Sequence, residues 1–401
     1  MLFPYAPLPP PLDLAGTKRN LPFLLELAKT HEVSVLSFGT EAEKRLFLSR
    51  YGHMVSGIRV VDTHRKRWAN GLERLWLMAT LRSPYRQLYR PEMQAAIDDL
   101  ASTGSYDLIH CCVPMFGYYR FPACVPVTSD THEVKFDLLR KTALHETNVL
   151  SKAVNFWCAR LGELEEPRLW RRFDALFATT DVDRQRMVAV DPSLAPVVVQ
   201  NGAGDEFFAK TGAPPEPRTM VFTGLFTHRP NAQGIEYFLS RIFPQILERV
   251  PDAKIYVVGK SPPPWLVRRG NEHVVVTGYV SDVRPYIHRA EVFVIPLLSG
   301  GGIRGKALEA MAMGKPIVTT TVGVEGIHLQ HRESALFADT PSQFADSVVE
   351  LFDDAVLRAS LADRAAAIAS QRYTWAAKGK ELDEALVRVV GSGRRRPGGD
   401  T

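Results

Sequence analysis

Residues 292–320 read VFVIPLLSGGGIRGKALEAMAMGKPIVTT and carry the pattern that decides the fold. The apolar run at 292–296 has the composition and length of a buried strand. A triple glycine follows, and apolar residues then recur at three- and four-residue spacing, as in a helix, until Gly314. Residues 317–320 have the composition of a second strand. Strand, glycine loop, helix and strand in this order predict half of a parallel α/β unit.

The glycine loop in this stretch is a candidate anion site. It lies at the carboxyl end of a predicted strand, where open α/β sheets bind ligands. It also leads into a helix amino terminus, whose N–H groups and dipole favour negative charge. Arg304 and Lys306 place two cations at this helix start, and Glu309 places a carboxylate just inside the helix. Two cations for phosphate groups and one carboxylate for a sugar diol predict a nucleotide-sugar site.

The same alternation of strands and helices extends outward and predicts two similar doubly wound, parallel-sheet halves. The length of 401 residues also exceeds one core, if a domain holds roughly 100–200 residues. A segment rich in glycine and proline separates the halves. The predicted parts are a first domain (1–200), a linker (201–218), a second domain (219–374), a last helix (375–390) and a basic, disordered tail (391–401).

The periodicity also predicts individual elements in each half. In the first, strands are expected at 33–38, 58–61, 107–112, 125–129, 176–180 and 197–200, with a helix at 17–30 and a short strand remnant at 2–5. In the second, strands are expected at 220–224, 255–259, 274–277 and 335–338, with helices at 232–249, 283–289, 342–353 and 357–371.

Composition limits the class of protein. An apolar fraction of 45% and a charged fraction of 23% are ordinary for a globular protein. We find no apolar run of roughly 18 residues and no opening signal segment, so neither a membrane span nor export is predicted. The cysteines show no metal-binding spacing and favour a reduced, cytoplasmic compartment; they are Cys111, Cys112, Cys124 and Cys158.

The net charge of +5 is unevenly distributed. Between Arg65 and Arg90 there are seven basic residues against one acid, with tryptophans and tyrosines interleaved. Such a segment suits an anionic membrane surface, and would make the protein peripheral at the inner face of the membrane. A solvated helix with inward-packed aromatics is the open alternative. No nucleic-acid-binding module accompanies the segment, so nucleic acid is not expected as a partner.

Residues 300–327, GGGIRGKALEAMAMGKPIVTTTVGVEGI, resemble the C-terminal signature of the family 4 glycosyltransferases, which have the two-domain GT-B fold. Gly224, Pro230 and Asn231 resemble the PN-containing loop of a bacterial subgroup of sugar transferases. Asp130 to Val134 resembles a D-x-H-N-V segment that lines the cleft between the domains. The resemblance implies two Rossmann-like domains facing across a cleft. It also implies transfer of a sugar from a nucleotide sugar, with retention of configuration and without a metal or cofactor.

The resemblance assigns donor-site roles one residue at a time. Glu309 falls where the family's glutamate accepts hydrogen bonds from the donor ribose diol. The family's sugar-holding glutamate is replaced here by Gly301, so the backbone amides of Gly300, Gly301 and Gly302 are expected to contact the sugar. Because Leu225 stands where many members have arginine, the diphosphate is expected to rely on Arg304, Lys306 and Arg229. These cations would stabilise the leaving diphosphate.

On the acceptor side, the resemblance places His132 near the anomeric carbon of the donor sugar. A purely structural role for His132 remains open. Asp130 would orient His132 or bind the acceptor. Gly16 would allow the first loop to approach the donor phosphate closely. Glu325 would contact the donor sugar, or serve only as a turn carboxylate.

Asp181 and Asp183 spell the D-x-D pattern with which another glycosyltransferase fold binds a metal. They follow a predicted strand and precede a predicted helix. Acidic residues in that place cap free N–H groups. Helix capping is therefore predicted, and no metal site.

A retaining glycosyltransferase is thus the leading hypothesis, with a cell-envelope or exopolysaccharide glycan or a lipid-linked sugar as acceptor. A nucleotide-sugar epimerase of the same fold, a phosphorylase and a non-catalytic nucleotide-sugar-binding relative are the alternatives. An NAD-dependent dehydrogenase is disfavoured, since no G-x-G-x-x-G follows an early strand.

Overall fold

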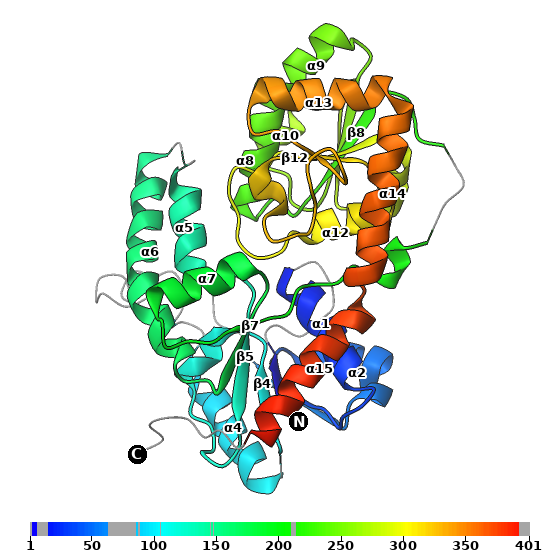
Figure 1. The fold of residues 1–401 in the computed structure, drawn as a ribbon. Coiled ribbons are helices and arrows are strands. Elements are labelled where there is room, and N and C mark those ends of the chain that lie inside the picture. Colours follow the sequence, from blue (N-terminus) through cyan, green and yellow to red (C-terminus); the bar gives the residue numbers. More distant parts are fainter. Residues whose placement is uncertain are drawn as a thin grey trace. The chain divides into compact units, whose positions relative to one another are not determined.

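The computed structural model describes residues 2–5, 15–62, 86, 89–104, 106–144, 146, 148–209 and 214–392. It divides into two compact units, Met1–Gln200 with Lys378–Thr401, and Asn201–Ala377. Each is an α/β unit with helices packed around a sheet (Figure 1). The predicted linker belongs to the second unit. Most of the last helix belongs to the first unit. Most of the basic segment from Arg65 to Arg90, and the tail beyond residue 392, lie outside the described residues.

The first unit is built on a seven-stranded sheet in the order β3-β2-β1-β4-β5-β6-β7, with every adjacent pair parallel. The short amino-terminal strand is therefore real, and it lies between β2 and β4. The strand order reverses at this point, which is where doubly wound sheets bind ligands. The strands are β1 (Leu2–Tyr5), β2 (Ser34–Phe38), β3 (Gly57–Val61), β4 (Ile109–Cys111), β5 (Val127–Thr131), β6 (Ala175–Ala178) and β7 (Val197–Val198).

The helices of the first unit include those that the sequence predicts at 17–30, at the D-x-D residues and at 375–390. They are α1 (Ala15–Leu27), α2 (Glu41–Tyr51), α4 (Pro91–Thr103), α5 (Lys135–Leu144), α6 (Val149–Trp170), α7 (Asp181–Val190) and most of α15 (Trp375–Gly391). Helix α1 begins two residues earlier than expected, so Gly16 lies in its first turn and not in the preceding loop.

Helices α5 and α6 form a hairpin, and Figure 1 shows them side by side. Glu166 on α6 joins the two helices. Its carboxylate accepts hydrogen bonds from the backbone N–H groups of Lys135 (3.2 Å) and Phe136 (3.0 Å), the first two residues of α5. These are donors that a helix start leaves without an intrahelical acceptor. Burial raises the pKa of Glu166 to about 8, although Lys135 and both N–H groups act to lower it.

The raised pKa of Glu166 predicts a pH-dependent stability of the first unit. Because the folded state favours the protonated acid, this stabilisation is complete below the ordinary pKa of 4.5 and is lost as pH rises to about 8. Glu166→Gln stays neutral and keeps an acceptor. We therefore expect the variant to become more stable relative to the wild type as the pH rises from 4.5 to about 8, as measured by the difference between their free energies of urea unfolding. A difference that is constant with pH would contradict the assignment.

The second unit has a six-stranded parallel sheet in the order β10-β9-β8-β11-β12-β13. Strands β8 and β11 are buried along their whole length, as expected for central strands covered by helices on both faces. The strand order reverses between them. The strands are β8 (Thr219–Thr223), β9 (Lys254–Val258), β10 (Val274–Gly278), β11 (Val292–Ile295), β12 (Ile317–Thr319) and β13 (Leu336–Phe337).

The predicted helices of the second unit are present, but one of them is divided and a further short helix at Pro264–Val267 was not predicted. The expected helix at 232–249 is divided into α8 (Arg229–Tyr237), a π-helical turn (Phe238–Ile242) and α9 (Phe243–Arg249). Pro244 explains the break, because proline has no N–H with which to continue the α-helical ladder. The others are α10 (Pro264–Val267), α11 (Arg284–Arg289), α12 (Gly305–Ala312), α13 (Pro341–Asp353) and α14 (Ala355–Arg372).

The two chain segments that leave the second unit are joined to each other. Ala203 N–H donates to the carbonyl oxygen of Tyr373 (2.7 Å), and Ala203 pairs with Thr374 in an isolated bridge. A Cβ on Gly202 would lie 2.7 Å from the backbone nitrogen of Trp375, so only glycine permits this approach. Among the described residues, no helix is both long and apolar enough to cross a membrane.

Candidate functional site

Two loops of the second unit meet where its strand order reverses, one after β8 and one after β11. Gly224, directly after β8, donates its N–H to the carbonyl oxygen of Val258 at the end of β9 (2.9 Å). A Cβ on Gly259 would lie 1.7 Å from the carbonyl oxygen of Gly224, so this contact requires glycine. The close approach fixes the loop after β8 against the end of β9.

Lys306 connects these two loops. Its ammonium donates to the Asn231 side-chain oxygen (2.8 Å) and lies 3.9 Å from the centroid of the Phe222 ring. Asn231 in turn donates its side-chain N–H to the carbonyl oxygen of Leu225 (2.9 Å). A Cβ on Gly224 would lie 3.2 Å from the Lys306 ammonium. The structure thus brings together two residues of the predicted donor site, Asn231 and Lys306, beside Gly224 of the PN-containing loop.

Arg304 has a different position. Its guanidinium is buried and donates to the carbonyl oxygens of Gly302 and Val322, the latter at 3.0 Å. Its Nη2 also lies 3.8 Å from a carboxylate oxygen of Glu325. A Cβ on Gly300 would lie 2.9 Å from the same nitrogen, and Gly302 has a φ of +63°. Arg304 therefore holds the glycine loop against the 3₁₀ turn at Thr321–Val324.

Glu309 and Arg229 occupy helices at the same end of the sheet. Glu309 lies three residues after Lys306 on α12, hence on the same helix face, and it is buried. Arg229 is the first residue of α8 and is exposed. The amino terminus of α12, with Arg304 as its N-cap residue, directs its first N–H groups toward the end of the glycine loop.

The sequence interpretation missed an exposed aromatic at the carboxyl end of β10. Tyr279 follows Gly278, which has a φ of +71°, and its ring lies 5.7 Å from the Lys260 ammonium. Lys260 follows Gly259 at the end of the adjacent strand β9. Two neighbouring strands that each end in glycine and then a large side chain were the signal that could have identified this pair.

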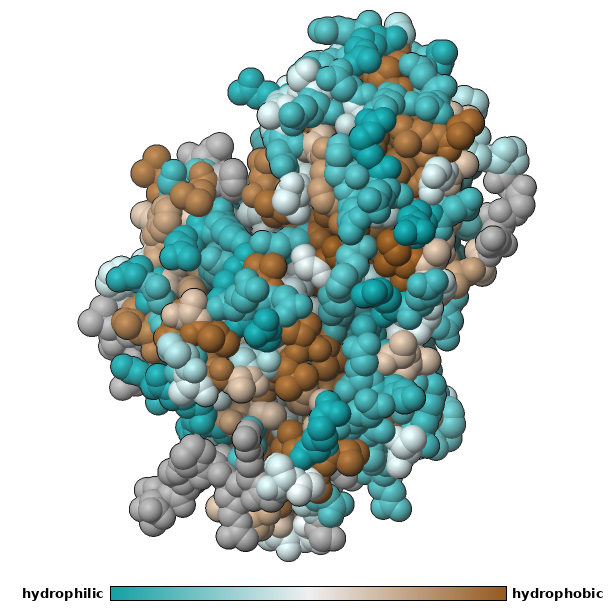
Figure 2. Space-filling view, in the orientation of Figure 1, coloured by the Kyte–Doolittle hydropathy of each residue, from teal (hydrophilic) through white to brown (hydrophobic). Residues whose placement is uncertain are grey.

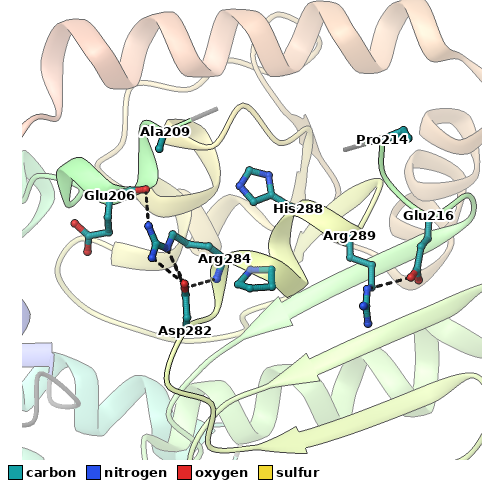
Figure 3. Close-up of a pocket in the computed structure, with 9 residues that line it drawn as sticks. Glu206, Ala209, Pro214, Glu216, Asp282, Arg284, His288 and Arg289 are labelled. Atoms are coloured by element: carbon teal, nitrogen blue, oxygen red, sulfur yellow. Dashed lines mark hydrogen bonds and ion pairs between the residues drawn. The ribbon is translucent and has the colours of Figure 1, made fainter. Parts of the chain in front are cut away.

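A pocket of about 470 Å³ lies elsewhere on the second unit, along α11 (Figure 3). Arg284 donates to both carboxylate oxygens of Asp282, and Arg289 pairs with Glu216 at 3.0 Å. Hydrogen bonds from Arg284 lower the pKa of Asp282, although partial burial acts to raise it. No residue of the glycine loop lines the pocket; the lining residues are Glu206, Ala209, Pro214, Glu216, Asp282, Arg284, Pro285, His288 and Arg289.

In the first unit, Asp130 forms a buried ion pair with Arg19 of α1. The guanidinium donates through Nε (3.0 Å) and Nη2 (2.7 Å) to the two carboxylate oxygens. Burial alone acts to raise the pKa of Asp130, but the ion pair outweighs it and the pKa is lowered. Asp130 is therefore ionised and fixed, and it joins the end of β5 to α1.

His132, two residues further, is joined to the same helix. Its Nε2 lies 3.0 Å from the Asn20 side-chain oxygen, and burial lowers the pKa of His132 to about 4. The ring is therefore neutral near pH 7. It donates from Nε2 to Asn20, which leaves Nδ1 as an acceptor. No local pattern marks Asn20, because its partner lies 112 residues away.

The D-x-D residues lie at the start of α7. Thr180 is the N-cap residue, and its side-chain oxygen accepts from the Asp183 N–H at 3.0 Å. The Asp183 carboxylate is buried and accepts from the Thr180 hydroxyl at 2.6 Å. Asp181 is exposed and pairs with Arg184. Within the ranges that the structure describes, no three His, Cys, Asp or Glu residues are grouped closely enough to hold a metal ion.

Comparison with known proteins gives three results. Residues 217–354 match the model of the family described as "Glycosyl transferases group 1", and this stretch makes up most of the second unit. A phosphatidyl-myo-inositol mannosyltransferase of Mycobacterium leprae is 25% identical over 191 residues, which is 46% of this chain and 50% of that protein. The chain thus matches half the length of that curated relative, and 36% and 44% of two others.

Solved structures resemble the chain over almost its whole length. HepE of Anabaena, solved with UDP and glucose, is 16% identical with a TM-score of 0.68, covering 96% of this chain and 98% of that one. Sucrose-phosphate synthase of Thermosynechococcus elongatus is 15% identical with a TM-score of 0.71, covering 98% and 99%. The predicted GT-B fold, with its two parallel-sheet units, is thereby confirmed.

Proposed function

We propose that the protein is a glycosyltransferase that transfers a sugar from a nucleotide sugar to an acceptor. The observation that carries this proposal is the placement of Lys306. It holds a cation between the two loops that meet where strand order reverses in the group 1 glycosyl transferase domain. This is the place at which open α/β sheets bind nucleotides.

The donor diphosphate would lie against Lys306 and the amino terminus of α12. As the bond to the sugar breaks, negative charge develops on the departing nucleoside diphosphate. Asn231 and the Phe222 ring hold the ammonium in position before the ligand arrives. A cation that needs no reorganisation stabilises the transition state more effectively than a mobile one. Arg229, at the start of α8, is the second cation we assign to the diphosphate.

The nucleoside and sugar would extend from this point in two directions. We assign the ribose diol to Glu309, on the same helix face as Lys306. The exposed Tyr279 ring, with Lys260 beside it, supplies a stacking surface for the base. The backbone of Gly300, Gly301 and Gly302 would contact the donor sugar, with Arg304 and Glu325 holding that loop in shape.

The first unit would contribute His132 to the reaction. A neutral ring with Nδ1 as acceptor can receive a hydrogen bond from a sugar hydroxyl near the anomeric carbon. We propose retention of configuration without a metal, with the leaving diphosphate assisting the incoming hydroxyl on the same face. Asp130 is occupied by Arg19, so its proposed role is to position His132. A glycan or lipid-linked sugar is the proposed acceptor class.

The proposal is tested with the full chain and a panel of nucleoside diphosphates and their sugars. A ligand at about 100 times its Kd stabilises the folded state by about 2.7 kcal/mol. We expect at least one nucleoside diphosphate to raise the Tm by roughly 5–10 °C, at about 2–4 °C per kcal/mol for a unit of this size. The matching nucleotide sugar should be slowly hydrolysed.

Three other outcomes are informative. No stabilisation by any nucleoside diphosphate contradicts the proposal. Stabilisation without hydrolysis or transfer would favour a non-catalytic binding protein. Conversion of the sugar into its epimer, without loss of the nucleotide, would favour the epimerase alternative.

A further inference from the structure

The α5–α6 hairpin of the first unit exposes an unusual share of apolar surface. Of the fifteen large apolar side chains exposed in the described part of the chain, five lie on these two helices. Figure 2 shows hydrophobic surface at the end of this hairpin. The five are Leu144 (60% exposed), Val149 (81%), Leu150 (74%), Trp157 (44%) and Leu164 (65%).

Most of these residues form one stripe along α6. Leu150, Trp157 and Leu164 are spaced seven residues apart, so they lie on one side of the helix. The exposed Ala153 lies on the same side, between the first two. The opposite side is already buried, through residues such as Ala159 and Glu166, and Leu161 at the edge of the stripe is buried as well. The exposed side chains of the stripe are therefore not needed for packing α6 against α5.

The exposed charged side chains of the two helices are all cationic. Arg140, Arg160 and Arg168 are exposed on the two helices. The described acidic residues of the hairpin are all partly or fully buried; they are Asp137, Glu146, Glu163, Glu165 and Glu166. Arg160 pairs with Glu163 at 2.5 Å, but its side chain is 76% exposed. An ion pair this exposed contributes little to stability, and Arg160 can exchange Glu163 for another anion.

We propose that the exposed stripe of α6, with Leu144 and Val149 at its end, is a surface that docks on an anionic lipid membrane. Aliphatic and tryptophan side chains on one helix face, with arginines beside them, are the composition that partitions into the headgroup region. Arginine can extend its charge toward lipid phosphates while its aliphatic stem covers apolar surface. The exposed cations give the complementarity to anionic lipid.

A protein partner fits this stripe less well. Arg160 lies between Trp157 and Leu164 on the same side of the helix. In a helix-to-helix interface it would bury a cation within an apolar seam, which is costly unless a matching anion is supplied. At a membrane surface the same arginine reaches the headgroups. Binding of a lipid surface by this stripe does not depend on the proposed reaction.

The test is sedimentation of the full chain with lipid vesicles. We expect binding to vesicles of phosphatidylcholine mixed with phosphatidylglycerol, and weak binding to phosphatidylcholine alone. Leu150→Glu combined with Trp157→Glu should weaken binding at least tenfold, because two apolar side chains no longer enter the interface. Arg160→Gln and Arg168→Gln should each weaken binding to the anionic vesicles about fivefold.

Val356→Glu is the matched control, since Val356 on α14 is 82% exposed and lies on the second unit. It should bind as the wild type does. All substituted positions are exposed, so the Tm should remain unchanged. Tryptophan emission gives a second measurement. Vesicles should shift it to the blue in the wild type, and less in Trp157→Phe.

Three results would overturn the proposal. The first is absence of binding to the anionic vesicles. The second is equal binding by the hairpin variant and the wild type, with loss only when Arg65, Lys66 and Arg67 are neutralised. The third is a concentration-dependent dimer that Leu150→Glu abolishes, which would assign the stripe to a second copy of the chain.

Discussion

Replacing Lys306 with glutamine should lower the turnover of the nucleotide sugar about 10²- to 10³-fold, the usual effect of losing one preorganised group that stabilises developing charge. The ammonium is held 2.8 Å from the Asn231 side-chain oxygen and over the Phe222 ring, where the loops after β8 and β11 meet. Glutamine retains a donor to Asn231 but has no charge. The folded second unit should therefore be preserved while the electrostatic contribution is lost.

The experiment compares kcat and KM of Lys306→Gln with those of Arg304→Gln and Arg268→Gln. Arg268 is exposed on the same unit and should behave as the wild type. Arg304→Gln removes the hydrogen bonds to Gly302 and Val322, so it should lower the Tm as well as activity. A Lys306 variant with wild-type kcat and unchanged affinity for nucleoside diphosphate would refute the role of this cation.

The contrast between Arg304 and Lys306 marks what the sequence can predict. The glycine loop, the helix after it and the parallel sheet followed from composition and spacing, because these depend on local preferences. The directions in which the Arg304 and Lys306 side chains point could not be predicted from composition and spacing. Arg304 turns back onto the carbonyl oxygen of Val322, eighteen residues later. Lys306 meets Asn231, which is seventy-five residues earlier. Such contacts depend on tertiary structure, and spacing along the chain does not specify them.

In the first unit, too, the contacts of the site residues could not be predicted from the sequence. The segment containing Asp130 and His132 was recognisable, but their partners in α1 were not. Nothing local distinguishes Arg19 and Asn20 from ordinary surface residues of an amphipathic helix. Only the parallel sheet, which places the end of β5 near α1, shows that both side chains are buried.

Replacing Arg19 with methionine should destabilise the first unit by about 3–5 kcal/mol, the cost of leaving one member of a buried ion pair without its partner. Arg19 and Asp130 are almost completely buried, and two hydrogen bonds join them. The double variant with Asp130→Leu removes both charges and should recover most of the loss. Urea unfolding of the wild type, both single variants and the double variant gives the coupling energy directly.

The pH dependence separates the lost ion pair from a simple packing defect. In the wild type, Arg19 keeps the pKa of Asp130 low, so the pair contributes above the ordinary pKa of 3.8 and is lost as the pH falls. Without Arg19, burial raises the pKa of Asp130, and the folded variant regains stability by binding a proton. The destabilisation by Arg19→Met should therefore be smaller at about pH 5 than at about pH 8. His110 and His132, each with a pKa of about 4, stay mainly neutral over this interval. A loss that is equal at both pH values would mean that Arg19 acts mainly through its packing against Phe23.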